Sequence, residues 1–191
     1  MNMLKNVLAV IGALVLVVVL GATVKLGSQV SKLDSGAMPA YMNMFGEVLE
    51  YGDPARAMMN EYKINEDISN EDAIETAKAI TEELNMRVTG DIKMYTKEDA
   101  APTEVKHARI LSVCSLEIAK VFLNYSRYYG GFMPCRVMLV EYGNGDRFLV
   151  TMDLDLAIHG GHTLPADMLE KAKFVQKAMH EIPSRAAKGD F

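Results

Sequence analysis

Residues 6–24 (NVLAVIGALVLVVVLGATV) form an uncharged and almost wholly apolar run, which Lys5 and Lys25 bracket. At a rise of about 1.5 Å per residue, a helix of this length is about as long as the hydrocarbon core of a bilayer is thick. In lipid, a single segment satisfies all of its own peptide groups only as a helix. The run therefore predicts a transmembrane helix, with residues 1–25 as an N-terminal anchor for a domain that folds in water.

A cleaved signal peptide is the competing interpretation of this run. The apolar region of a signal peptide is shorter, at roughly 7–15 residues, and it ends in a small-x-small cleavage site. Here residues 25–28 (KLGS) follow the run, and the suitable triplet at 35–37 (SGA) lies too far downstream. The sequence therefore favours a retained anchor. Charge does not determine its orientation, because the amino terminus and Lys5 on one side nearly balance Lys25, Lys32 and Asp34 on the other.

The charge balance limits the partners of the domain. The chain carries 20 basic and 25 acidic side chains, which leaves 18 against 25 once the two lysines that flank the anchor are removed. Recognition of phosphate backbones depends on clustered Lys and Arg, so nucleic acid is not an expected partner. The same balance argues against adhesion to anionic lipid beyond the anchor. The chain after the anchor is long enough for one hydrophobic core.

The segment that follows the anchor is predicted to be a tether with short methionine-rich helices. Residues 27–39 mix Gly, Ser, Lys and Asp with little periodicity, which is typical of a tether. Residues 40–51 have a helical pattern that ends at Gly52. Asp53 and Pro54 then open another helix, with Asp as the cap and Pro at the first helical position.

The rest of the chain alternates between strand and helix patterns. Ser69 begins a capping box, Ser115 caps a second helix that Gly130 and Gly131 end, and Pro183 stops the last helix. The expected order is strand 61–65, helix from 69, strands 86–95 and 105–113, helix from 115, strands 135–142 and 147–153, and helix 164–182. This order (β-α-β-β-α-β-β-α) predicts an α+β two-layer sandwich of one antiparallel sheet with helices over residues 61–191, after a tether over 26–60.

The hairpin between the last two strands predicts a register. Asn-Gly is the strongest short hairpin signal, because both central residues of a type I′ turn need positive φ. A two-residue loop of Asn144 and Gly145 sets the pairing of the strands on either side. The expected pairs are Tyr142 with Arg147, Met138 with Thr151, and Arg136 with Asp153. The expected core face carries Cys135, Val137, Leu139, Val150, Met152 and Leu154.

Several short motifs after residue 50 point to one family. They are residues 51–55 (YGDPA) before Met58-Met59, residues 132–137 (FMPCRV), residues 153–155 (DLD) leading to 158–161 (IHGG), and Pro165 opening the last helix. Over residues 40–191 the chain resembles the membrane-anchored proteobacterial branch of the domain of unknown function 302 family. The resemblance implies a small α+β domain, held at the inner membrane by one helix and facing the periplasm. It implies no reaction for any residue.

His159 and His162, close after Asp153 and Asp155, form the best candidate cluster of metal ligands. Imidazole and carboxylate groups suit zinc or copper, and the glycines at 160–161 would let both rings converge. The alternative is a loop in which the glycines are present because they adopt positive φ angles readily. Two histidines make only half of a structural site.

The methionines suggest a second candidate metal site. The chain has 14 Met and no Trp, and Met42 and Met44 lie together after the tether. Thioethers are soft ligands that favour Cu(I). The alternative is a packing or docking surface, because Met also fills irregular cores and adaptable interfaces.

Cys114 and Cys135 flank the second helix of the domain. In an oxidising compartment the two could form a disulfide, provided that their strands are neighbours. Buried thiols and a redox pair are the alternatives. The chain has no Cys-x-x-Cys motif, so thioredoxin-like exchange and haem attachment both lack their signature.

Four further residues are candidates for contact with a ligand or partner. Tyr125 and Tyr129 would line a pocket mouth or simply finish an amphipathic helix. Arg136 and Asp153 lie opposite each other in the expected register, where the carboxylate would neutralise the guanidinium.

The chain has no complete catalytic signature: Gly-x-Ser-x-Gly, His-Glu-x-x-His and a Walker A loop are all absent. We therefore expect a non-enzymatic accessory or binding domain, with a membrane protein complex, a small ligand or a second copy as its partner. The alternative function is a metal or redox protein that uses His159 and His162, the methionines or the cysteine pair. The sequence identifies no cofactor.

Overall fold

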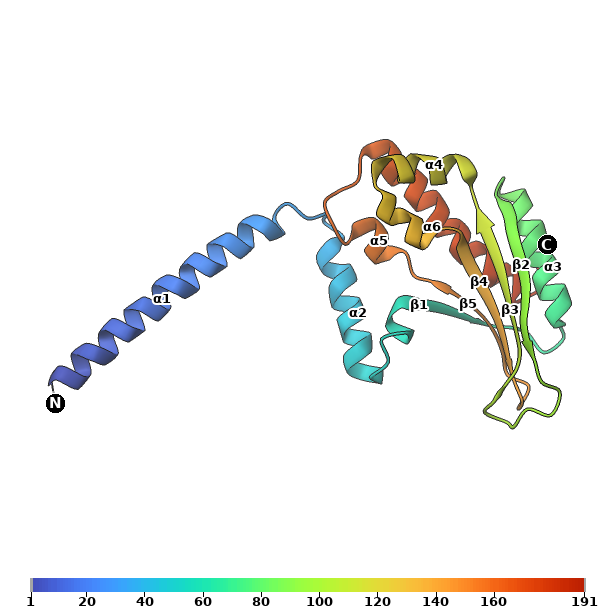
Figure 1. The fold of residues 1–191 in the computed structure, drawn as a ribbon, viewed down its shortest axis with the longest axis horizontal. Helices are drawn as coiled ribbons and strands as arrows, with labels where there is room; N and C mark the ends of the chain where they lie inside the picture. Colours follow the sequence, from blue (N-terminus) through green and yellow to red (C-terminus); the bar gives the residue numbers. More distant parts are fainter. Residues whose placement is uncertain (1, 191) are drawn as a thin grey trace.

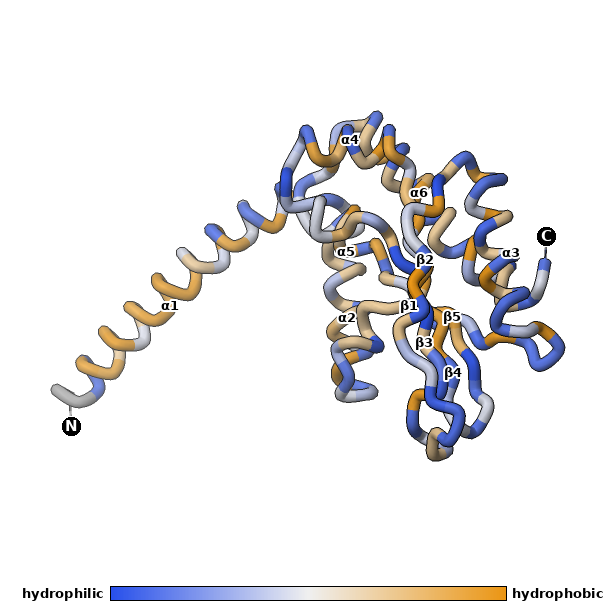
Figure 2. Tube along the Cα trace, turned by 45° about the vertical axis from the view of Figure 1, so that its right-hand side comes forward, coloured by the Kyte–Doolittle hydropathy of each residue, from blue (hydrophilic) through white to orange (hydrophobic). Residues whose placement is uncertain are grey.

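A computed structural model describes residues 2–190 and shows a long N-terminal helix that projects from an α+β domain (Figure 1). This helix, α1 (Asn2–Val30), contains a stretch from Lys5 to Val30 that is long and apolar enough to cross a membrane. None of that stretch is buried against the domain. Apolar residues follow one another along most of its length (Figure 2). The predicted apolar helix is therefore present, and it continues for five residues beyond Lys25.

The connection between α1 and the next helix, α2 (Ala37–Tyr51), is shorter and more ordered than the tether expected over 27–39. Asp34 fixes it to the domain. The backbone N–H of Asp34 donates to the carbonyl of Gly161 (2.8 Å), and its carboxylate accepts from the N–H of Gly36 (2.9 Å). The Nδ1 atom of His159 lies 2.8 Å from the same carboxylate. The connection is therefore docked on the domain rather than free.

The domain is built on one five-stranded sheet, in which every neighbouring pair is antiparallel and the order is β1-β5-β4-β3-β2. Its strands are β1 (Met59–Lys63), β2 (Arg87–Thr96), β3 (Val105–Cys114), β4 (Cys135–Tyr142) and β5 (Arg147–Met152). Its helices are α3 (Asn70–Glu83), α4 (Leu116–Tyr125), α5 (Asp155–His159) and α6 (Ala166–Ala186), with 3-10 turns η1 (Arg56–Met58) and η2 (Arg127–Phe132). The predicted α+β sandwich and its element order are confirmed.

The main core lies between the sheet and the helices α3 and α6, which cover one of its faces (Figure 1). Ser69 starts α3 as expected, because its hydroxyl accepts from the N–H of Asp72. The largest fully buried aliphatic side chains of this core are Ile74, Ile80, Leu111, Leu139, Leu149 and Ile182. A smaller cluster around Phe122 and Ile158 joins α4, α5 and α6.

Two predicted helix ends are wrong. The helix from Ser115 does not reach Gly130, because Ser126 adopts an extended conformation after Tyr125, and a 3-10 turn follows. Pro183 does not stop the last helix. It is fully buried inside α6, and the N–H of Ala187 donates to its carbonyl (2.9 Å), so the helix continues to Ala186. A buried apolar ring packed in the core offsets the one hydrogen bond that proline removes.

The predicted hairpin register is also wrong, by one residue. The loop has three residues, 143–145: Gly145, at φ 89°, donates to the carbonyl of Tyr142 (3.0 Å), and Tyr142 donates to Asp146 (2.9 Å). This arrangement is a type I turn followed by a bulge at a left-handed glycine. The observed pairs include Glu141 with Arg147, Val140 with Phe148, Leu139 with Leu149 and Val137 with Thr151.

The one-residue shift reverses the faces of β5, since side chains alternate along a strand. Leu149 and Thr151 are buried in the core, whereas Val150 and Met152, which were expected there, lie on the opposite face. A distant contact explains the longer loop. The N–H of Gly143 donates to the carbonyl of Glu104 (2.9 Å), and a Cβ atom on Gly143 would lie 2.2 Å from a backbone oxygen of the neighbouring chain segment.

A partly buried ionic network joins the sheet to α3. The Nε and Nη2 atoms of Arg109 donate to the two carboxylate oxygens of Asp91, each at 2.7 Å, and Nη1 donates to Glu71 (2.8 Å). Lys78 lies 2.8 Å from the same Asp91 carboxylate. The Arg109 guanidinium, which is almost fully buried, holds the pKa of Asp91 well below its ordinary value. The network therefore contains a buried cation that depends on Asp91 and Glu71.

Candidate functional site

The face of the sheet away from α3 and α6 combines apolar side chains with Glu61, Lys63 and Arg136, and no helix within residues 2–190 has its main contacts there. A row of paired residues crosses four strands of this face: Ile92, Ile110, Met138 and Val150. Helix α2 stands beside the face and makes its main contacts with η1 and α5. The open face is thus available to a ligand or a partner.

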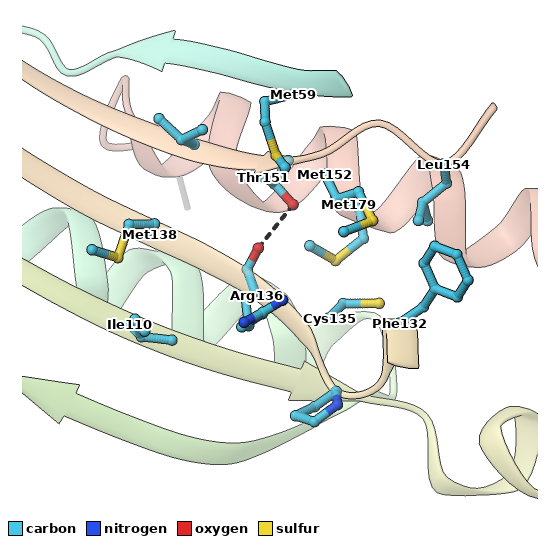
Figure 3. Close-up of a pocket in the computed structure, with 12 residues that line it drawn as sticks. Met59, Ile110, Phe132, Cys135, Arg136, Met138, Thr151, Met152, Leu154 and Met179 are labelled. Atoms are coloured by element: carbon cyan, nitrogen blue, oxygen red, sulfur yellow. Dashed lines mark hydrogen bonds between the residues drawn. The ribbon is translucent and has the colours of Figure 1, made fainter. Parts of the chain in front are cut away.

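A pocket of about 290 Å³ opens in this face at the end of the β4–β5 pairing (Figure 3). Val137 and Thr151 are the last residues paired there, and the Thr151 hydroxyl donates to the carbonyl of Arg136 (2.9 Å). The pocket reaches from the open face to Met179 on α6, which is buried. Its lining contains four methionines and a cysteine: Met59, Met138, Met152, Met179 and Cys135. The other lining residues are mostly apolar: Ile110, Phe132, Pro134, Arg136, Val150, Thr151 and Leu154.

Arg136 supplies the charge of this pocket. Its side chain is exposed, and within residues 2–190 it forms no ion pair. The expected pair with Asp153 is wrong, because the Asp153 carboxylate accepts from the N–H of Asp155 (2.7 Å). The N–H of Asp153 in turn donates to the carbonyl of Met58 (2.9 Å). The guanidinium is therefore free to meet an anion at the pocket.

A wider groove of about 1,290 Å³ adjoins the pocket and runs between α2 and the edge of the sheet formed by β1 and β5. The two spaces share Met59, Phe132, Val150 and Met152 as lining residues. The groove also brings together four residues that the sequence singled out: Met42, Met44, Asp153 and Asp155. Its α2 wall carries Glu47 and Glu50, so this side of the groove is acidic.

The domain that carries this pocket can be assigned by comparison. Residues 60–182 match the model of a family described as domain of unknown function DUF302. The chain belongs to the DUF302 family. Its structure is similar to the crystal structure of an uncharacterized conserved DUF302 protein from Bacillus stearothermophilus, with a TM-score of 0.51 and 16% sequence identity. That similarity covers 68% of this chain and 98% of the other, and at this identity it concerns the fold alone. No curated protein matches the chain.

The two histidines of the DUF302 domain that were candidate metal ligands lie in different surroundings. His159 is held by Asp34, as described above, and His162 is exposed. Asp155 accepts a hydrogen bond from the side chain of Gln176. In the part of the chain that the structure describes, no group of three or more His, Cys, Asp and Glu side chains is placed to hold a metal ion. A contact that the sequence did not reveal, Asp34 to His159, explains the position of the first histidine.

The two candidate tyrosines lie outside both spaces. Tyr129 packs edge-on against Phe122, with 5.0 Å between ring centroids, and belongs to the smaller apolar cluster. Tyr125 is half exposed and lies beside Tyr129, with their ring centroids 6.3 Å apart. Neither lines the pocket or the groove, whereas Phe132, at the end of the same turn, lines both.

The two cysteines are free thiols on neighbouring strands of the DUF302 domain. Cys135 lies opposite Val113, one residue before Cys114. Burial raises the pKa of the Cys135 thiol to about 11, and it also raises the pKa of Cys114. Both groups are therefore protonated near neutral pH and are poor nucleophiles.

Most of the pocket could not be found from the sequence because the predicted register was wrong by one residue. Met152 and Val150 were assigned to the core, and Met138 was paired with Thr151 rather than with Val150. The signal that would have corrected this is Gly143, which allows a three-residue loop as readily as Asn144-Gly145 suggests a two-residue one.

Proposed function

We propose that this DUF302 protein is a membrane-anchored binding module that holds an amphipathic anion in the pocket on the open face of its sheet. The observation that carries the proposal is an apolar, methionine-lined pocket with the unpaired guanidinium of Arg136 at its lining. Ligand pockets combine mostly apolar walls with a few polar groups that set orientation. A guanidinium binds carboxylate or phosphate groups through charge-assisted hydrogen bonds, so the fitting ligand has such a head and an apolar tail.

The anchor in this proposal is α1, retained in the mature protein. Its apolar stretch from Lys5 to Val30 has no contact surface on the domain, which supports a lipid environment for it. The family resemblance favours the inner membrane, with the domain in the periplasm. A domain held at the membrane surface would have access to amphipathic anions that dissociate from the bilayer. The proposed role is binding or transfer rather than catalysis, because Cys135 and Arg136 are the only ionisable side chains among the lining residues of the pocket and form no acid–base pair.

Octanoate tests the proposal, since it has a carboxylate and a short apolar tail and dissolves in water. Full-length protein in nanodiscs, labelled with ¹³C at its methionine methyl groups, would be titrated by NMR. We expect the methyl resonances of the pocket methionines to shift. Arg136→Gln should lower the affinity for octanoate about tenfold, because a charge-assisted hydrogen bond is lost. It should leave the affinity for neutral octanol unchanged.

The matched control is Arg127→Gln, which removes an exposed arginine that lines neither space. It should leave octanoate affinity unchanged. An equal affinity of the Arg136→Gln variant and the unmodified protein, or shifts confined to methionines outside the pocket, would refute the proposed site.

A second candidate function, soft-metal binding, is supported by the five sulfur atoms that line the same pocket. Thioethers and thiolates are ligands of Cu(I), and binding would displace the proton of Cys135. Under this candidate, the full-length protein retains one Cu(I) against a chromogenic Cu(I) chelator, and Met152→Leu, which preserves side-chain volume, weakens retention about tenfold. A protein that gives up all Cu(I) to the chelator would rule this function out.

A further inference from the structure

Helix α2 exposes large apolar side chains, of which Met42 also borders the groove and Tyr41 touches the domain through its hydroxyl. They recur at helical spacing along one stripe, which we call the outer stripe of α2. Its members and their exposed fractions are Met38 (48%), Tyr41 (44%), Met42 (59%), Phe45 (54%) and Leu49 (71%). A helix on the surface of a water-soluble domain has the reverse arrangement, with apolar residues inward. An exposed apolar stripe of this length marks an interaction surface.

The opposite side of α2 packs on the domain, with Met44 and Val48 half-buried. Ala37 and Ala40 are buried there. The hydroxyl of Tyr41, at the edge of the outer stripe, donates to the carbonyl of Gly160 (2.9 Å). Asn43 and Glu47 face the groove. Because α2 already packs on the domain through this other side, the outer stripe is not needed for contact with the core.

The position of α2 in the chain places this stripe close to α1. Only residues 31–36 separate the two helices, so the start of α2 lies within about 25 Å of the end of α1 at the maximal reach of a chain. Asp34 shortens that reach further by docking the connection on the domain. Figure 1 shows α2 leaving the end of α1 at an angle rather than continuing its axis.

We propose that α2 is an interfacial helix, whose outer stripe lies in the surface of the bilayer that α1 enters. This inference rests on the proposed anchoring by α1. Tyr and Phe side chains are favoured at the level of the lipid headgroups. Leu and Met side chains are favoured at the acyl boundary below the headgroups. The helix contains no basic residue and carries Glu47 and Glu50, so its contact is apolar and suits zwitterionic lipid. In this position α2 lies between the bilayer and the groove, which keeps the pocket within reach of membrane amphiphiles.

The absence of tryptophan from the chain makes a direct test possible. Phe45→Trp in the full-length protein would place a single indole in the outer stripe. The protein would be reconstituted in phosphatidylcholine vesicles with plain or dibrominated acyl chains, since bromine quenches only indoles that lie in the lipid. We expect a blue-shifted emission that loses most of its intensity in the brominated vesicles. Leu49→Trp, one turn further along the stripe, should behave in the same way.

The matched control is Tyr95→Trp, an exposed aromatic position on β2, which should emit at longer wavelength and remain unquenched. Phe45→Trp emission that is unquenched would overturn the proposal, whether the indole is in water or is covered by a second copy and therefore blue-shifted. Flotation of the vesicles separates this failure from failure of the anchor. Protein that does not float refutes both, and protein that floats with an unquenched indole refutes the interfacial helix alone.

Discussion

Replacing Val15 and Val18 together with arginine is expected to remove the protein from the membrane fraction. Both side chains lie near the middle of α1 and are exposed, so the substitutions disturb no contact within the domain. Each arginine at the centre of a membrane helix raises the free energy of insertion by about 2.5–3.5 kcal/mol. The measurement is the share of the chain that sediments with membranes after extraction with alkaline carbonate.

The control for this pair is Val15→Leu with Val18→Leu, which changes the same positions and keeps them apolar. It should sediment like the unmodified protein. If the arginine variant also resists carbonate, α1 is not what holds the chain to the membrane.

Arg109→Ala is expected to lower the free energy of unfolding by about 2–3 kcal/mol, because it removes charge-assisted hydrogen bonds to two carboxylates. The substitution leaves Asp91 partly buried without its bidentate partner and deprives Glu71 of its hydrogen bond. Lys78, 2.8 Å from Asp91, compensates only in part, because it cannot satisfy both carboxylate oxygens in the same way. Urea denaturation of the full-length protein in detergent, followed by circular dichroism, measures the loss.

Arg185→Ala serves as the control, because Arg185 pairs with Glu83 and Glu181 where water reaches all three groups. Its loss of stability should be much smaller. An Arg109→Ala variant that is no less stable than this control would contradict the account of the partly buried network.

The same network predicts how stability depends on pH. The folded-state pKa of Asp91 is lowered, so its contribution is present above the ordinary pKa near 4 and is lost as pH falls below it. The unmodified protein should therefore lose stability more steeply than Arg109→Ala between about pH 5 and pH 3.

Elements set by local sequence were predictable. The cap at Ser69, the helical periodicity after it and the alternation in the strands fixed the element order, and all of these depend on neighbours in the chain. The hairpin register was not predictable from its own residues. It depends on Gly143 fitting against the segment at 101–104, so a contact some 40 residues away decides between two loops that the local sequence allows.

The candidate site depends still more on distant contacts. Arg136 was found by its position in the strand, but the carboxylate of its expected partner, Asp153, accepts from the N–H of Asp155 instead. The ligand-like His159 is occupied by Asp34, 125 residues earlier. Residues of the pocket come from β1, β3, β4, β5 and α6, and their convergence follows from the sheet order β1-β5-β4-β3-β2. Sequence patterns identify such residues one at a time. Only the tertiary structure determines which of them lie close together.

Both proposals depend on α1 remaining attached and holding the DUF302 domain at a membrane. The most direct test is carbonate extraction of cells that express the unmodified chain, followed by mass spectrometry of its N-terminal peptide. We expect a membrane-bound chain whose N-terminal peptide still includes residues 2–5, the start of α1. A soluble chain that begins beyond Lys25 would contradict this expectation.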